Sequence, residues 1–99
     1  MVAARADVQT ALAARYMVQL CNHFGHRVPV SHDQVQGRID FPDAPCLLTA
    51  QEGLLSMMIQ ASETATLDRI KGVMESHLAR FAFRDQPQID WHDVPATAG

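Results

Sequence analysis

The middle of the chain alternates apolar and polar residues over consecutive segments that are separated by very short turns. The alternation covers residues 35–41, 46–50 and 55–61, and the intervening turns are short. A period of two is the pattern of a half-buried β-strand, and turns this short join antiparallel neighbours. A fourth segment precedes these at residues 28–32, where Pro29 indicates a sheet edge. The pattern therefore predicts a four-stranded antiparallel meander.

Helical patterns flank this meander on both sides. The first predicted helix is capped by Thr10 and ends before Gly25, which we expect in the left-handed conformation. The second is capped by Ser62. Gly72 lies in its interior, where glycine destabilises a helix, and we expect a close packing contact to offset that loss of stability. The apolar positions expected to be buried recur at helical spacing: Leu12, Tyr16, Leu20 and Phe24, then Leu67, Ile70, Met74, Leu78 and Phe81.

Weaker strand patterns at the two ends complete the order of elements. Residues 4–8 alternate, and Ile89 and Trp91 indicate a short strand beyond the break that Pro87 makes. The predicted order is β-α-β-β-β-β-α-β. It indicates an α+β fold, in which a curved antiparallel sheet carries both helices on one face.

The composition is that of an ordinary globular domain. The 99 residues are 47% apolar and 19% charged, so we expect one domain over residues 1–93 and a flexible tail over residues 94–99. A formal net charge of −3, with dispersed basic residues, argues against nucleic acid as a partner. No segment is apolar enough to span a membrane, and the N-terminus lacks the apolar core of a signal peptide. We therefore expect a cytoplasmic protein with no membrane partner.

Two cysteines and three histidines raise the question of a metal site. Cys21, His23 and His26 have the spacing of a metal motif, although two of the three point about 200° apart on a helix. Further ligands such as His77 or Cys46 would be needed. The alternative is that Cys21 lies in the core, His23 is partly exposed and His26 caps the helix carbonyls. We expect both thiols to be buried and unlinked, since the cytosol keeps thiols reduced.

His77 lies on the apolar stripe of the second predicted helix, and Arg80 follows one turn later. A buried imidazole needs hydrogen-bond partners, so one interpretation is a satisfied core histidine. The other is a histidine that lines a pocket as an acid, base or ligand contact, where it would hold an anion together with Arg80. His26, His77 and Arg80 are therefore the ligand-binding candidates.

Other catalytic patterns do not occur in the sequence. The five glycines are isolated, no serine lies in a nucleophile elbow, and the single lysine, Lys71, falls on the polar side of its helix. The aspartates at positions 40, 43, 90 and 93 flank turns and strand ends, as solvated termini do. We assign no catalytic residue and expect no cofactor.

Several segments resemble a bacterial family. They are residues 15–16, 20–26, 37–41, 46–50 and 77–84, with Trp91 near the end. Over about residues 5–92 the chain resembles the family called domain of unknown function 2218. The resemblance implies no established activity. Similar domains attached to siderophore-interacting flavin reductases imply a link to iron or siderophore handling. Some relatives carry an aldolase label, but neither the single lysine nor any carboxylate-rich metal site supports that activity here. The family-like positions with chemistry are Cys21, His23, His26, His77 and Arg80.

Three functions stay open at this level. The first is a small binding or accessory domain that holds a small-molecule ligand or docks on a redox partner protein. The second is an enzyme that uses His77 and Arg80 in a pocket, and the third is a metal protein that uses Cys21, His23 and His26. A homodimer is compatible with each of them. The observation that separates them best is whether His77 and residues 23–26 face a common cavity.

Overall fold

One antiparallel sheet of six strands organises the computed structural model, which describes residues 1–95. Its spatial order is β2-β3-β4-β5-β1-β6. The order along the chain is the predicted β-α-β-β-β-β-α-β, so the α+β prediction is confirmed. The strands are β1 (Val2–Gln9), β2 (Val30–His32), β3 (Gln36–Phe41), β4 (Ala44–Gln51), β5 (Leu54–Ala61) and β6 (Trp91–Val94), and the helices are α1 (Ala13–Phe24) and α2 (Thr64–Phe81).

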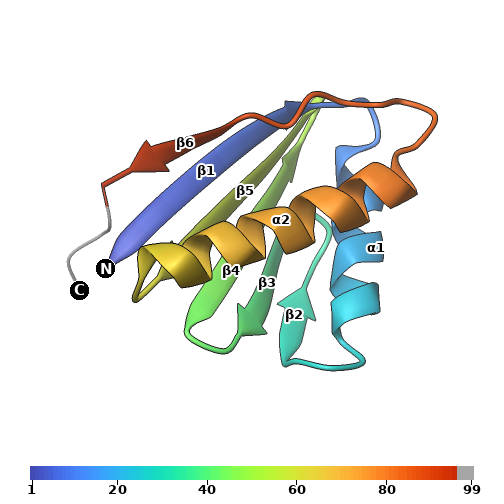
Figure 1. The fold of residues 1–99 in the computed structure, drawn as a ribbon. Helices are drawn as coiled ribbons and strands as arrows, with labels where there is room; N and C mark the ends of the chain where they lie inside the picture. The colour runs from blue at the N-terminus through green and yellow to red at the C-terminus, as the bar shows by residue number, and fades with distance from the viewer. Residues whose placement is uncertain (96–99) are drawn as a thin grey trace.

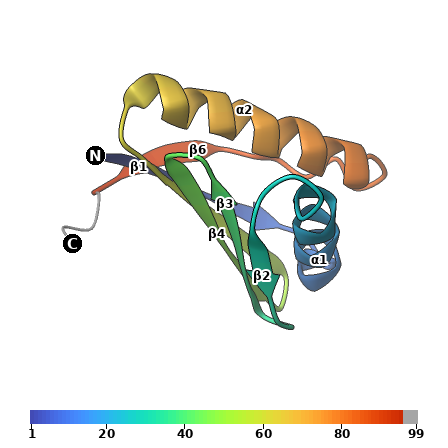
Figure 2. The ribbon, with the colours of Figure 1, turned by 90° about the horizontal axis from the view of Figure 1, so that it is seen from below.

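Both helices cover the same face of the sheet, as Figure 1 and Figure 2 show from two directions. α1 packs on β2, β3 and β4, whereas α2 packs mainly on β5 and β1. The helices also contact each other, so a crevice runs between them above the sheet. The core fills the space between sheet and helices, and its largest completely buried side chains include Met17, Leu20, Ile39, Leu48, Leu55, Met57, Ile59, Ile70, Met74 and Leu78.

The hairpin between β3 and β4 is tighter than the sequence predicted. The turn was expected over residues 42–45, but Pro45 already lies in β4 and pairs with Asp40. A two-residue loop suffices because Asp43 takes a positive φ of 59°. The next turn uses Gly53 at φ 77°, a conformation that glycine adopts without steric cost.

Close packing of α1 on β3 depends on Gly37. A Cβ at this position would lie 2.9 Å from Cys21 Sγ and 3.4 Å from Met17 Cγ. Gly37 is buried and pairs with Leu48 in the sheet. The missing side chain therefore lets α1 approach the sheet directly above this position.

α1 ends at Phe24 as predicted, but its start and the conformation of Gly25 differ from the prediction. Thr10 is not its cap: the helix begins at Ala13, and the Thr10 hydroxyl accepts a hydrogen bond from the Leu12 amide at 3.1 Å. Leu12 consequently lies outside the helix and is 39% exposed, not buried. Gly25 is right-handed at φ −61°, because its amide donates to Cys21 O and continues the helical turn. The other predicted buried positions of α1, Tyr16, Leu20 and Phe24, are buried.

Two expectations for α2 are also wrong. The helix begins at Thr64, and Glu63, not Ser62, holds the cap position without a side-chain cap bond. Gly72 has no packing contact with another element: it is exposed, and apart from its chain neighbours and the backbone of its own helix no described heavy atom lies within 4 Å of the place where its Cβ would stand. Leu67, Ile70, Met74 and Leu78 are buried as predicted, whereas Phe81 is only partly buried.

The C-terminal strand closes the sheet beside β1. Trp91 pairs with Ala6, and Val94, at the start of the predicted tail, still belongs to β6. The rest of that predicted tail, residues 96–99, lies outside the described residues. Among residues 1–95, neither helix is long and apolar enough to cross a membrane.

Candidate functional site

The C-terminal end of α1 and the second half of α2 form one wall each of a pocket, which we call the histidine pocket. Its polar lining is His23, His26, Arg27, His77 and Arg80. Its apolar lining is Phe24, Val28, Phe41 and Val73. The volume, about 580 Å³, is in the range of small-molecule sites. His77 and the segment around His23 and His26 therefore do face a common cavity.

Ring contacts hold the inner part of the histidine pocket together. The ring centroids of His23 and His77 are 4.8 Å apart, and the Phe24 ring is also 4.8 Å from that of His77. Phe24 in turn packs edge-on against Phe41 at 5.0 Å. The two aromatic side chains anchor this cluster in the core, so the imidazoles are positioned by buried neighbours.

His77 is oriented by a backbone hydrogen bond. Its Nδ1 lies 2.7 Å from the carbonyl oxygen of Val73, one turn earlier on α2. A carbonyl only accepts, so Nδ1 donates and the neutral ring keeps Nε2 as an acceptor. His77 is partly buried with its Nδ1 hydrogen-bonded, as a core histidine would be, and it also lines the pocket. Each of the two interpretations made from the sequence is therefore correct in part.

The pocket has a positive electrostatic character. Partial desolvation of the His23 ring is the main cause that lowers its pKa although the residue is exposed overall, and the nearby basic groups His77, Arg80, His26 and Arg27 lower the pKa further. No carboxylate lines the pocket. Arg27 and Arg80 form no ion pair within residues 1–95. These two guanidinium groups are therefore free to bind an anion.

Cys21 does not share a site with His23 and His26. Its side chain is completely buried against Gly37, on the side of α1 that faces the sheet, whereas both histidines are exposed. Burial raises the pKa of the Cys21 thiol, and Cys46 is also buried and free. Residues 1–95 contain no group of three or more His, Cys, Asp or Glu side chains arranged to hold a metal ion.

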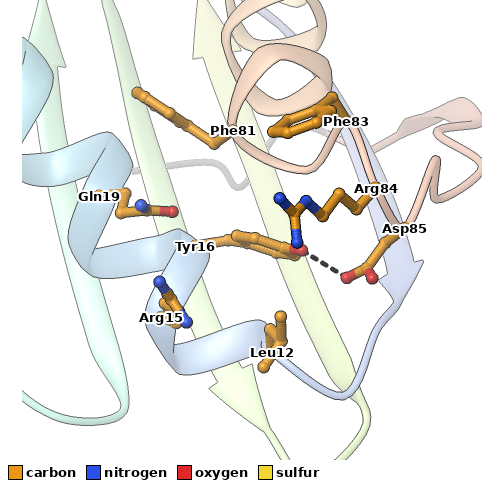
Figure 3. A pocket seen from close by; sticks show the side chains of 8 residues that line it. All are labelled: Leu12, Arg15, Tyr16, Gln19, Phe81, Phe83, Arg84 and Asp85. Carbon is orange, nitrogen blue, oxygen red and sulfur yellow. Dashed lines mark hydrogen bonds between the residues drawn. The ribbon is translucent and has the colours of Figure 1, made fainter.

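A second pocket opens further along the same crevice, and Figure 3 shows its lining. We call it the tyrosine pocket. Tyr16 is buried, and its hydroxyl donates a short hydrogen bond to Asp85 Oδ2. Burial raises the pKa of Tyr16, and the bond to Asp85 raises it further. The other lining residues are Leu12, Arg15, Gln19, Phe81, Phe83 and Arg84, and the volume is about 560 Å³.

The sequence analysis did not identify this second pocket. Tyr16 was assigned to the core, and Arg15, Gln19 and Asp85 were not considered as site residues. One signal was present: Arg15, Gln19 and His23 are spaced by four and share one face of α1. Its meaning depended on Asp85, which lies 69 residues after Tyr16 and is brought to it only by the fold.

Comparisons with known proteins agree with the fold and identify the family. A model of uncharacterised proteins conserved in bacteria, DUF2218, matches residues 5–92. The NMR structure of PA4090 from Pseudomonas aeruginosa is similar, with a TM-score of 0.80 and 33% sequence identity, over 93% of this chain and 96% of that chain. No curated protein matches the chain. The chain therefore belongs to the DUF2218 family of bacterial proteins.

Proposed function

We propose that the protein is a binding domain that holds a small anionic ligand in the histidine pocket. One observation carries the proposal: three imidazoles and two guanidinium groups line a single aromatic-walled pocket that has no carboxylate. Guanidinium groups form strong, charge-assisted hydrogen bonds with carboxylates and phosphates. A bound anion would also favour proton uptake at His23, because its charge offsets the positive groups that lower the pKa of that ring.

Binding is favoured over catalysis by what the lining contains. His77 and Arg80 do share a pocket, as an enzyme would need, and His77 Nε2 is a candidate acid or base. The lining includes no serine, cysteine, lysine or carboxylate to act as a nucleophile or as a partner for the histidines. It does supply charge, shape and aromatic surface, which are the requirements of recognition.

An aromatic carboxylate is the ligand type that fits best. Phe24 and Phe41 line the same pocket as the two guanidinium groups and make part of its wall aromatic. Catechol carboxylates, the building blocks of many siderophores, combine these features, and the implied link of related domains to siderophore handling supports this class. The buried, free thiols of Cys21 and Cys46 support a cytoplasmic location for such a function. Docking on a redox partner and homodimer formation stay predictions, which light scattering and co-purification would test.

The test uses 2,3-dihydroxybenzoate as the probe and neutral catechol as its uncharged control. We expect saturable amide shifts in NMR spectra at the lining residues with the carboxylate and much weaker shifts with catechol. Arg80→Gln should weaken binding about tenfold or more, because a charge-assisted hydrogen bond is lost. Arg69→Gln, on an exposed position of the same helix, is the matched control and should leave affinity unchanged.

The pH dependence gives an independent test. Because the pKa of His23 is lowered in the free protein, its ring is neutral near pH 7 and takes up a proton when an anion binds. Affinity should therefore rise as the pH falls below neutral and His23 takes up its proton more readily in the complex. Equal affinity for the carboxylate and catechol, or equal losses in Arg80→Gln and Arg69→Gln, would contradict the proposal. Stoichiometric metal in the purified protein would instead favour the metal alternative.

A further inference from the structure

A buried polar atom in the wall of the tyrosine pocket has no partner. Gln19 Oε1 is shielded from solvent and makes no hydrogen bond to any of residues 1–95. Its side chain extends from α1 toward Tyr16 (Figure 3). Tyr16 cannot satisfy it, since the single hydroxyl proton goes to Asp85. A buried polar group is nearly always paired, so this wall lacks one hydrogen-bond donor.

The same pocket has an excess of positive charge. Arg15 comes from α1 and Arg84 from the turn after α2, and neither forms an ion pair in the described part of the chain. The one carboxylate in the lining, that of Asp85, already accepts hydrogen bonds from Tyr16 and Thr10. The lining therefore has two positive charges and one negative charge. A ligand with a single negative charge would make the pocket neutral.

Exposed aromatic surface lies at the rim of the pocket. Phe83 is 63% exposed, an uncommon position for a large apolar ring. The guanidinium of Arg84 lies 5.5 Å from its ring centroid, and Phe81 lines the pocket beside it. Such a ring offers a flat stacking surface next to a cation.

We propose that the tyrosine pocket is a second small-molecule site, which binds an aromatic monocarboxylate that carries an N–H or O–H donor on its ring. The carboxylate pairs with Arg15 and Arg84, and the ring stacks at Phe83. The side chains that shield Gln19 Oε1 from solvent turn aside on binding, so that the ring donor reaches this atom. This site shares no lining residue with the histidine pocket, so it does not rest on the function proposed there.

Three probes of nearly identical shape separate the parts of this proposal. Indole-3-acetate has the ring, the donor and the charge, whereas 1-methylindole-3-acetate lacks the donor and indole-3-acetamide lacks the charge. Calorimetry or NMR titration should show saturable binding of indole-3-acetate. Removal of either the donor or the charge should weaken binding about tenfold, because the site is left with an unpaired polar group. No saturable binding, or equal affinity for all three, would overturn the proposal.

Variants assign the binding to this pocket. Gln19→Leu should abolish the preference for indole-3-acetate over its methylated analogue, because the acceptor that makes the distinction is gone. Arg84→Gln should lower the affinity for indole-3-acetate about tenfold. Arg69→Gln, at an exposed position of α2, should leave this affinity unchanged. Arg80→Gln should leave this affinity unchanged, and loss of indole-3-acetate binding in Arg80→Gln would place the ligand in the histidine pocket and overturn the assignment. If Gln19→Leu does not fold, the preference among the three probes in the wild-type protein still decides.

Discussion

Replacing glycine by alanine should have opposite effects on stability at two positions of this fold. At Gly37, the added Cβ would meet Cys21 Sγ at 2.9 Å and Met17 Cγ at 3.4 Å. Both of these side chains are completely buried, so neither can move into solvent. At Gly72, on the exposed side of α2, the added Cβ meets no described heavy atom within 4 Å beyond its chain neighbours and the backbone of its own helix. The two sites differ in surroundings and not in chemistry.

The magnitudes follow from these surroundings. Overpacking at Gly37 costs about 1–3 kcal/mol, and alanine recovers about 0.5–1 kcal/mol of backbone entropy in a strand, so a net loss of up to about 2.5 kcal/mol is expected. Gly72→Ala should raise the free energy of unfolding by about 1 kcal/mol, which is the helix-propensity difference in a helix interior. The two variants should therefore differ by about 1–3.5 kcal/mol.

Urea unfolding of the two variants and the wild-type protein measures this difference. The comparison requires that the free energy of unfolding depends on urea concentration with the same slope in all three proteins. A Gly37→Ala protein at least as stable as wild type would refute the close approach of α1 to β3. A sharper measurement uses the Cys21→Ala background, in which the clashing sulfur is absent. There the cost of Gly37→Ala should shrink, because the two positions are in contact and their effects are not additive. An undiminished cost would show that Cys21 is not the neighbour that resists the methyl group.

Further predictions concern the core, the tyrosine pocket and the thiols. Leu20→Ala should lower the free energy of unfolding by about 2–5 kcal/mol in denaturant melts, since Leu20 is completely buried; a loss below about 0.5 kcal/mol would contradict its placement. Tyr16→Phe should cost about 1 kcal/mol at pH 7 through the lost bond to Asp85. Because the folded pKa of Tyr16 is raised, wild-type stability should fall as pH rises above about 10, and Tyr16→Phe should lose that contribution. Mass spectrometry of the unreduced protein should show Cys21 and Cys46 as free thiols, and a mass two hydrogens lighter would contradict this.

The fold could be predicted from the sequence because its signals are local. Alternation with a period of two and short turns identify the meander, and each strand pairs with the next one along the chain from β2 to β5. The predicted start of α1 was wrong in part for a non-local reason. Thr10 has the side chain of a cap, but its hydroxyl instead contacts the Leu12 amide and Asp85, 75 residues away. Periodicity contains no information about such a partner.

The candidate sites also differ in whether a local sequence signal identifies them. His77 was singled out because a polar residue interrupts an apolar stripe, and the structure brings it to the ring of His23 at 4.8 Å. The tyrosine pocket was missed because its polar residues are unremarkable in sequence. Gln19 is conspicuous only once its Oε1 is known to be buried without a partner in residues 1–95, which depends on how α1 and α2 pack.

The basic residues of the histidine pocket also have an effect on their own helices, and this effect can be separated from binding. His23 lies in the last turn of α1 and Arg80 in the last turn of α2, where the helix dipole favours a positive charge. That interaction is worth about 0.3–1 kcal/mol at an exposed position and decays within one turn. It accounts for a cation such as Arg80 at a helix end, but not for His77, which lies one turn earlier and whose bond to Val73 leaves Nε2 available as an acceptor. A purely structural role predicts that Arg80→Gln lowers stability slightly without affecting anion binding. Recognition of an anion predicts that affinity falls about tenfold while stability changes by no more than that dipole contribution.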